Sequence, residues 1–548
     1  MNNPILKYGF MSIAAATILT GCGSGNNLTI VSPPIENIDQ QPLKASELNE
    51  FEAQNWKDLD LGQDTIPGMS VNKAYSQILT MTKNGQQVVR KGEPVIVAVI
   101  DSGVDTEHED LDGVLWVNED EIPGNGIDDD KNGYIDDVHG WNFLGDIIEE
   151  NLEYERIVRD ADKLPADIVA KARKEYNEKL SQATEQKAFL EQQLQAVKEA
   201  QQTLQQATGK NEFTIEDVNK IEANNENLNR AKLIGQQVIN NYESFENILE
   251  LINNDLNETI ALLNGEKLKT NYRMDILGDD PYVWDTGIYG NNEYSGPDPE
   301  KADAFHGTHV AGIIAAERDN GKGVNGVANN ARIMVLRAVS QADEYDKDVA
   351  KAIRYAADNG AKVINTSFGK YHSPNPEWVW EAIEYAASKD VLIVNAAGNE
   401  GIDTDVTQVY PQDQEGAGEE ISDNFLTVGA LNYRYGPNVV ANFSNYGGRS
   451  VDVFAPGVAV YSTAPNNKYR NAGGTSMASP AVAGVAAVLR SQFPKLTAAQ
   501  TKQIIMDSGL TLPIDVVLGD DTTQAFTDIT VSGKMANLYN ALILASKI

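Results

Sequence analysis

The sequence predicts an α/β core built on a mainly parallel sheet and interrupted by a long antiparallel helical hairpin, a coiled-coil insertion. Short apolar runs recur along most of the chain and alternate with helical patterns, an order typical of parallel sheets covered by helices. Between residues 150 and 266, apolar residues instead repeat every seven positions, which indicates long paired helices. The chain has 548 residues, of which 41% are hydrophobic and 23% charged, so it is able to bury a sizeable core.

The composition excludes two classes of protein. The chain carries 80 acidic and 44 basic residues, a net charge of -36, whereas binding to nucleic acid needs a basic face. We therefore expect no nucleic-acid partner. A single cysteine cannot form a disulfide within the chain, which excludes a fold stabilised by disulfides.

Residues 1–21 have the features of a bacterial export signal. Lys7 precedes an apolar run of about a dozen residues, which is too short to span a bilayer because that takes about 20. The string LTGC, ending at Cys22, resembles the lipobox of bacterial lipoproteins. The resemblance implies a lipid on Cys22 and an anchor in the bacterial cell envelope, in the outer membrane rather than the inner one, with the other domains outside the cytoplasm. The alternative is a signal peptide that only happens to end near a cysteine.

The core is predicted in two parts that follow a tether. Residues 22–55 are polar and rich in Gly, Pro and Asn, so we interpret them as flexible. The first part of the core spans 56–149 and the second 267–548. Five apolar runs predict buried parallel strands at 95–100, 332–339, 362–366, 391–396 and 425–430. Helical patterns lie between them at 347–359 and 378–389.

The insertion at 150–266 contains two seams of apolar residues separated by a break at 207–211. The first seam comprises Val169, Tyr176, Ala183, Leu190, Val197 and Leu204. The second comprises Ile221, Leu228, Gly235, Tyr242, Leu249, Leu256 and Leu263, with a partner row of Ala231, Val238, Phe245 and Ile252. We expect two helices of about 40–50 residues that bury these seams against each other. The alternative is that the seams pack on the α/β body.

Three polar residues stand where a hydrolytic site needs them. Asp101 ends the first buried strand, in VAVIDSGVD, and the carboxyl ends of parallel strands are where open α/β sheets bind ligands. His306 and Ser476 each stand at the start of a helical stretch of small residues, in FHGTHVAGIIAA and GGTSMASPAVAGVAAVLR. A hydroxyl, an imidazole that takes its proton and a carboxylate that orients the imidazole are the groups that nucleophilic acyl transfer needs.

The strings around these residues resemble those of the subtilisin-like serine peptidases. DSGVD contains Asp101, HGTHVAG begins at His306, AAGNEG contains Asn399 and GTSMASP contains Ser476, and the order Asp, His, Ser is that of the family. The resemblance implies that Ser476 is the nucleophile, His306 the general base, Asp101 its orienting carboxylate and Asn399 a donor to the oxyanion.

The resemblance covers residues 56–146 and 270–548, and it implies a three-layer α/β/α fold and hydrolysis of peptide bonds. It also implies two backbone segments that bracket an extended substrate, namely Ser367, Phe368 and Gly369, and Ala396, Ala397 and Gly398. A peptide bound as an added strand is recognised mainly through its backbone, so we expect protein or peptide substrates of broad sequence. His309, the second histidine of HGTH, is interpreted as structural.

An acidic loop after the first core strand resembles the start of an EF-hand calcium loop, with oxygen ligands at alternating positions followed by a glycine. Its predicted ligands are Asp128, Asp130 and Asn132, with Asp136 or Asp137 closing the site. The twelfth position is His139 rather than glutamate, so a complete EF-hand is not expected. A further calcium site of the family type is expected at Asp110 and Asn320. The alternative to the first site is a solvated acidic turn.

These features support two hypotheses from different classes. The first is a calcium-stabilised, lipid-anchored serine endopeptidase. The second is a catalytically silent scaffold that binds partners through the helical hairpin. The four complete motifs argue against the scaffold, because a protein without catalytic demand has little need of them. An intermediate reading is that the hairpin docks a substrate or regulator while the core cleaves.

Overall fold

The computed structural model describes residues 46–548 except 84–85, 286, 415 and 417. The predicted signal peptide, the predicted lipidation site Cys22 and most of the predicted tether lie outside the described residues. The described chain divides into a body, formed by residues 46–150 and 272–548, and a helical unit, Asn151–Asn271. Within the described ranges, no helix combines the length and apolar character needed to cross a bilayer.

The body is built around a nine-stranded sheet with the order β12-β15-β9-β8-β7-β6-β3-β5-β4. In that order the strands are Leu510–Thr511, Lys534–Met535, Val453–Pro456, Phe425–Leu431, Leu392–Ala396, Val363–Thr366, Val95–Asp101, Ala331–Arg337 and Gly140–Asn142. All neighbours run parallel except β12 and β15. The five apolar runs form β3, β5, β6, β7 and β8, which confirms the mainly parallel sheet.

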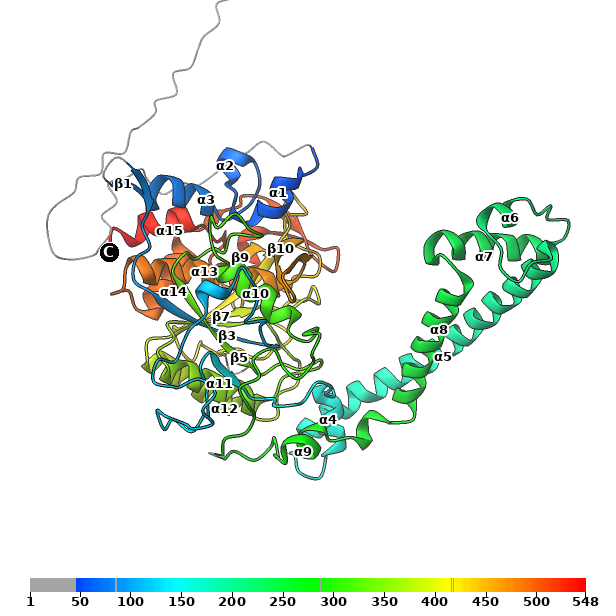
Figure 1. Ribbon diagram of the computed structural model, residues 1–548, viewed down its shortest axis with the longest axis horizontal. Helices are drawn as coiled ribbons and strands as arrows, with labels where there is room; N and C mark the ends of the chain where they lie inside the picture. The colour runs from blue at the N-terminus through cyan, green and yellow to red at the C-terminus, as the bar shows by residue number, and fades with distance from the viewer. Residues whose placement is uncertain (1–45, 84–85, 286, 415, 417) are drawn as a thin grey trace, which may run out of the picture. The chain divides into compact units, whose positions relative to one another are not determined.

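Helices cover both faces of this sheet. Along β3, Val97 and Val99 belong to one hydrophobic core, whereas Ala98 and Ile100 belong to the other. The first core includes residues of α10 (Phe305–Ala315), α13 (Thr475–Gln492), α14 (Ala498–Ser508) and α15 (Leu538–Ala545). The second includes residues of α11 (Asp346–Asp358) and α12 (Pro376–Ser388), and Figure 1 shows these two helices on the opposite side of the strands from α13 and α14. A strand buried on both faces explains the continuous apolar run, and the layers confirm the α/β/α fold.

Short elements complete the body. Three two-stranded hairpins pair β1 with β2, β10 with β11 and β13 with β14. Their strands are Thr80–Lys83, Gln86–Val89, Val460–Ala464, Lys468–Ala472, Asp515–Val517 and Thr523–Ala525. The remaining short helices after β3 are η3 (Asp112–Val114), α9 (Tyr272–Leu277) and η5 (Phe526–Asp528).

Residues 56–79, which precede β1, contribute to the first hydrophobic core. The helices before β1 are α1 (Glu50–Asn55), η1 (Trp56–Asp58), α2 (Leu61–Asp64), α3 (Val71–Ala74) and η2 (Tyr75–Leu79). Helix α1 lies within the predicted tether, and its start is fixed by a capping box between Asn49 and Glu52. Trp56 is 1% exposed and donates from Nε1 to the carbonyl of Val458 at 3.1 Å. The indole of Trp56 therefore anchors the segment that precedes β1 to the rest of the body.

The helical unit contains α4 (Glu153–Arg159), α5 (Ala166–Thr208), α6 (Ile215–Asn219), α7 (Glu226–Tyr242), α8 (Phe245–Leu263) and η4 (Lys267–Lys269). Helix α5 is continuous over 43 residues and ends at Gly209, whose φ is 68°. The prediction of a second helix of similar length is wrong. The return limb breaks at Glu243, which has φ 66°, and a new helix begins where the Ser244 side chain accepts from the amide of Asn247.

The two limbs pack along each other, with α8 returning beside α5 (Figure 1). In the first seam, five of the six predicted residues are buried, all but Val197. In the return limb the buried positions are Ala231, Gly235, Val238, Phe245 and Ile252, whereas Tyr242 of the predicted seam is 40% exposed. The partner row is therefore buried as a whole, whereas Gly235 is the one buried member of the predicted second seam. The buried row keeps its seven-residue spacing across the break at Glu243, so the break shortens the helix without shifting the repeat.

Candidate active site

Asp101 and His306 meet at the carboxyl edge of the sheet. Asp101 is the last residue of β3 and is 2% exposed, and His306 is the second residue of α10. His306 Nδ1 donates to Asp101 Oδ1 at 2.7 Å, and the amide of Ser102 donates to the same oxygen at 2.7 Å. The next residue must be glycine, because a Cβ on Gly307 would lie 2.1 Å from the carbonyl oxygen of Gly103. The carboxylate thus fixes one face of the imidazole and leaves Nε2 free to accept a proton.

The environment raises the pKa of His306 above its usual value of 6.5. Burial acts to lower this pKa, but the charge of Asp101 and the hydrogen bond to it raise the pKa by more. The ring keeps 37% of its side-chain surface exposed. The imidazole is therefore stabilised in its protonated form while one edge remains accessible.

Ser476 is the second residue of α13, next to the predicted substrate segment. Its hydroxyl donates to the carbonyl of Ser367 at 3.0 Å, and the Ser367 hydroxyl donates to the carbonyl of Ser476 at 3.0 Å. Ser367 also lines the cavity that contains His306. The structure therefore brings Ser476 to the edge of the site, with its hydroxyl turned toward Ser367 rather than bonded to the imidazole.

Asn399 lies beside the start of α13, and Thr475 fixes the orientation of its amide. The Asn399 Oδ1 atom accepts from the Thr475 amide at 2.8 Å and from the Thr475 hydroxyl at 3.0 Å. Both atoms of the amide lie beside Gly474, because a Cβ added there would be 3.5 Å from Nδ2 and 3.6 Å from Oδ1. Gly474 has φ 150°, so only glycine fits this turn comfortably. Thr475 stands beside Ser476 in GTSMASP, yet the sequence reasoning did not single it out.

The two predicted substrate segments follow neighbouring parallel strands, so they share one edge of the sheet. Ser367, Phe368 and Gly369 follow β6, and Ala396, Ala397 and Gly398 end or follow β7. The first segment pairs with the chain near Tyr410 through Lys370. In the second, the Gly398 amide donates to the Thr475 hydroxyl at 3.0 Å. Each segment is therefore hydrogen-bonded directly to a residue at the start of α13.

A cavity of about 310 Å³, which we name the His306 cavity, opens beside the predicted triad. It is lined by Asp101, Ser102, Ile148, Ala302, Asp303, Phe305, His306, Arg337, Val339, Ser340, Gln341, Ser367 and Phe368. The wall combines the Asp101 and His306 side chains with the first substrate segment. A peptide that lies on that segment therefore has space for a side chain next to the imidazole.

His309 lies one turn further along α10 and has a different environment. It is fully buried, and its Nε2 atom lies 3.0 Å from the carbonyl oxygen of Arg470. Burial lowers the pKa of His309 to about 4. A neutral imidazole bound to the backbone agrees with the structural role expected for it.

The acidic loop brings together three carboxylates, one of which the sequence reasoning missed. Glu121, Asp128 and Asp130 each place an oxygen within 4.8 Å of the others. Asn132 donates from Nδ2 to Asp130 and Asp137 at 3.0 and 2.9 Å. Hard oxygen donors of this kind suit Ca²⁺. Glu121 stands seven residues before Asp128, outside the repeat that the EF-hand pattern covers.

Other predicted ligands are engaged elsewhere. Asp136 accepts from the amides of Asn125 and Gly126 at 3.1 and 2.8 Å. His139 lies outside the acidic group, with Nδ1 2.7 Å from the carbonyl oxygen of Trp116. Asp136 is not part of the group of Glu121, Asp128 and Asp130 whose oxygens lie within 4.8 Å of one another.

The second predicted calcium site is compact and closed by hydrogen bonds. Asn320 donates from Nδ2 to Asp110 at 2.6 Å, and the amide of Val324 donates to the other Asp110 oxygen at 3.1 Å. Asp110 is fully buried. Both of its oxygens therefore already accept a hydrogen bond from the loop that a cation would join.

Several known proteins are similar to part of this chain. The thermophilic serine proteinase of Bacillus sp. (strain AK1) is 46% identical over 189 residues, which cover 34% of this chain and 43% of that protein. Subtilisin DY of Bacillus licheniformis is 35% identical over 209 residues, 38% of this chain and 71% of that protein. A solved protease structure from Pseudoalteromonas arctica PAMC 21717 aligns with 28% identity and a TM-score of 0.36, over 46% of this chain and 74% of that one. The chain thus spans less than half the length of the AK1 proteinase.

The model of the subtilase family matches residues 92–529. This range contains β3 with Asp101, α10 with His306, Asn399 and the start of α13 with Ser476. Since the match extends over most of the chain, the chain belongs to the subtilase family.

Proposed function

We propose that the chain is a serine endopeptidase that hydrolyses peptide bonds with Ser476, His306, Asp101 and Asn399. The observation that carries this proposal is the 2.7 Å hydrogen bond between His306 Nδ1 and Asp101 Oδ1, formed at the sheet edge beside Ser476. Membership of the subtilase family and the similarity to proteins named as serine proteinase and subtilisin support it.

In the proposed reaction, the Ser476 hydroxyl turns from the carbonyl of Ser367 toward His306 Nε2. Its oxygen attacks the scissile carbonyl as Nε2 takes the proton, and Asp101 stabilises the imidazolium. The Asn399 amide and the Ser476 backbone N–H donate to the oxyanion at the N-terminus of α13. His306 then gives the proton to the leaving amine, and water releases the acyl group by the same steps in reverse order.

The test replaces the nucleophile. Ser476→Ala should abolish cleavage of an unfolded protein and labelling by a fluorophosphonate, because both need the hydroxyl. Ser532→Ala, at a serine of the body far from α13 in the sequence, is the control and should leave both intact. A wild type that neither cleaves nor labels would contradict the proposal and favour a silent scaffold.

The acidic loop is proposed to hold a structural Ca²⁺ through Glu121, Asp128 and Asp130, with Asn132 and Asp137 beside them. Three clustered carboxylates repel one another without a cation, which supports this assignment. Adding Ca²⁺ at about 100 times its Kd to chelator-treated protein should stabilise it by about 2.7 kcal/mol. Asp128→Asn should reduce the rise in Tm, and an unchanged Tm on calcium addition to the wild type argues for a solvated acidic turn. Calcium at Asp110 and Asn320 is the weaker case, since hydrogen bonds already close that pair.

Lipidation of Cys22 and a place in the bacterial cell envelope, with the body outside the cytoplasm, are proposed from the lipobox-like string LTGC. Cys22→Ala should release the protein from the membrane fraction and abolish incorporation of labelled fatty acid. Incorporation that persists in Cys22→Ala would contradict a lipid at this residue.

The helical unit is proposed to dock protein substrates or a regulator while the body cleaves. Large apolar side chains on its surface support this role, with Phe189, Leu233 and Leu251 53%, 56% and 50% exposed. Deleting residues 152–264 should leave cleavage of a short peptide and reduce cleavage of whole proteins. Equal loss for both substrates would assign the unit to folding of the body instead.

A further inference from the structure

The position of the His306 cavity defines which substrate side chain enters it. The cavity includes Ser367 and Phe368 of the first substrate segment but none of residues 396–398. Side chains of an extended peptide alternate between opposite sides. We call the substrate residue whose carbonyl is attacked the cleaved residue. If its side chain enters between the two segments, the side chain of the residue before it points to the opposite side and faces the His306 cavity. The cavity therefore receives the side chain of the residue that precedes the cleaved residue.

The arginine in the wall of this cavity already uses four of its five N–H donors. Arg337 is 1% exposed, and its guanidinium donates only to neutral oxygens. Its acceptors are the carbonyl oxygens of Ser102, Gly145 and Ile147 and the side-chain oxygen of Asn142, at 2.6–3.2 Å. Burial lowers the pKa of Arg337 to about 10, although Asp303 and Asp146 act to raise it. Arg337 thus has few donors left for an acidic substrate side chain.

Asp303 is the opposite case, because it has an acceptor to spare. Its Oδ1 atom accepts from the amide of Gln341. Its Oδ2 atom is buried and has no hydrogen-bond partner among the described residues. A buried carboxylate oxygen without a donor is costly, so a donor that reaches it gains more than an ordinary hydrogen bond. Gln341 is exposed, so its side chain is able to move aside.

We propose that Asp303 is a specificity-determining residue that selects substrates with Lys or Arg immediately before the cleaved residue. The substrate cation displaces the Gln341 amide and pairs with the Asp303 carboxylate next to His306. This inference rests on the proposed peptidase function and adds a substrate class to it.

The test uses the full chain and four fluorogenic peptides that differ only at this position, which holds Lys, Arg, Ala or Glu. For the wild type, kcat/KM for Lys and Arg should exceed that for Ala by about tenfold to a hundredfold, and that for Glu should be lowest. Asp303→Asn should reduce the Lys-to-Ala ratio to about threefold or less, because the charge-assisted bond is lost. Gln341→Ala should keep the preference, since it removes only the competing donor.

The matched control is Glu300→Gln, an exposed carboxylate three residues before Asp303, which removes the same charge and should leave all four ratios as in the wild type. Equal cleavage of the four peptides by wild type that labels with fluorophosphonate overturns the inference and leaves the proposed function standing. The inference is also overturned if Asp303→Asn keeps the preference for Lys and Arg, or if the wild type prefers a charge only at positions that follow the cleaved bond. If the wild type neither labels nor cleaves, the proposed function fails and this inference fails with it.

Discussion

The body keeps charged groups in its interior, whereas α5 of the helical unit keeps them at its surface. In the body, Arg273 is fully buried and bonds Asp348 at 2.6 and 2.8 Å and Asp279 at 2.6 Å. Its guanidinium also lies 4.7 and 4.6 Å from the ring centres of Tyr289 and Tyr345. These charges are removed from water, so each depends on its partner.

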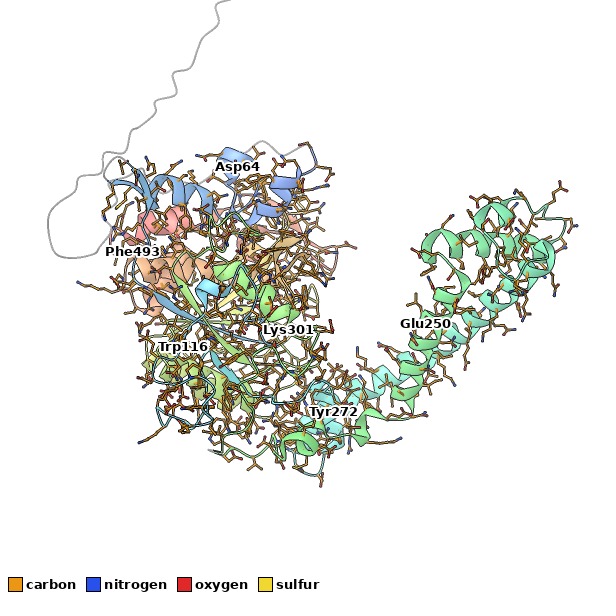
Figure 2. The ribbon with its side chains drawn as sticks, viewed as in Figure 1. Asp64, Trp116, Glu250, Tyr272, Lys301 and Phe493 are labelled. Atoms are coloured by element: carbon orange, nitrogen blue, oxygen red, sulfur yellow. The ribbon has the colours of Figure 1, made fainter. Side chains whose placement is uncertain are left out.

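Along α5, by contrast, the ion pairs have long N–O distances and lie exposed to solvent. Lys174 and Glu178 are 3.9 Å apart, with side chains 80% and 60% exposed. What holds the limbs together is a row of small and aliphatic residues, and side chains project into solvent around Glu250 of α8 (Figure 2). The difference teaches where a single substitution matters. In the body, removing one charge leaves another buried and unpaired, whereas along α5 the exposed charges matter little and the apolar row is the sensitive part.

The largest effect is expected at the buried carboxylate of the site. Asp101→Asn should lower kcat/KM about 10³–10⁴-fold, because the amide no longer stabilises the imidazolium or the required tautomer. Steady-state cleavage of one peptide measures the change. Asp162→Asn, at an exposed carboxylate of the helical unit, is the matched control and should change nothing. A loss below tenfold for Asp101→Asn would show that the buried carboxylate of the body matters little more for catalysis than an exposed carboxylate of the helical unit.

The next effect concerns stability. Arg273→Met should destabilise the body by about 3–5 kcal/mol, because it leaves Asp348 buried without its cation and Asp279 with Lys347 alone. Arg230→Met makes the same change at an exposed position of the helical unit and should stay within about 0.5 kcal/mol. Denaturant unfolding followed by tryptophan fluorescence measures Arg273→Met, because all six tryptophans belong to the body, and far-UV circular dichroism measures Arg230→Met. Equal effects for the two variants would show that burial of the charge does not decide its importance.

A smaller and local effect is expected in the apolar row. Leu204 is fully buried in the helical unit, and its Cδ1 atom would lie 2.5 Å from a Cβ on Gly235. Leu204→Ala should destabilise the packing of α5 on α7 by about 2–4 kcal/mol, whereas Leu233→Ala, at a site 56% exposed, should have little effect. Hydrogen exchange should rise around residues 190–245 and stay constant in the body. Exchange that rises in both units would mean that they unfold together.

The same contrast explains what the sequence allowed us to predict. Strands such as β3 were predictable because burial on both faces requires a continuous apolar run. The Asp101–His306 pair was found because contiguous motifs carry it. The Arg273 network was not found, since its partners stand 6 and 75 positions away and no local pattern links them. Glu121 was missed for a related reason, because the turn that brings it to Asp128 lies outside the repeat that named the loop.

In the helical unit, the errors concern helix length and the choice of the buried row. The seven-residue count placed Tyr242 inside, but Tyr242 is 40% exposed and α7 ends there. A new helix begins at Phe245, and the buried row keeps its seven-residue spacing across the break. Two apolar rows shared this spacing, and the period alone does not distinguish which of them is buried.

The smallest effect we expect concerns the pH dependence of kcat/KM, which groups of the body alone should determine. The proposed mechanism needs neutral His306, and Asp101 raises the pKa of this histidine above 6.5. The profile of kcat/KM should therefore fall on the acid side with a midpoint above 6.5. His309 has a pKa lowered to about 4, so it stays neutral throughout this range and adds no second limb.

Removing residues 152–264 should not move this midpoint, because the groups that shift the pKa of His306 all belong to the body. Activity of wild type and deletion variant on one short peptide from pH 5 to 9 measures it. A midpoint displaced in the deletion variant would mean that charges of the helical unit reach the imidazole. In that event the two units share one electrostatic environment, and the division between a charged interior and a separate apolar limb does not extend to catalysis.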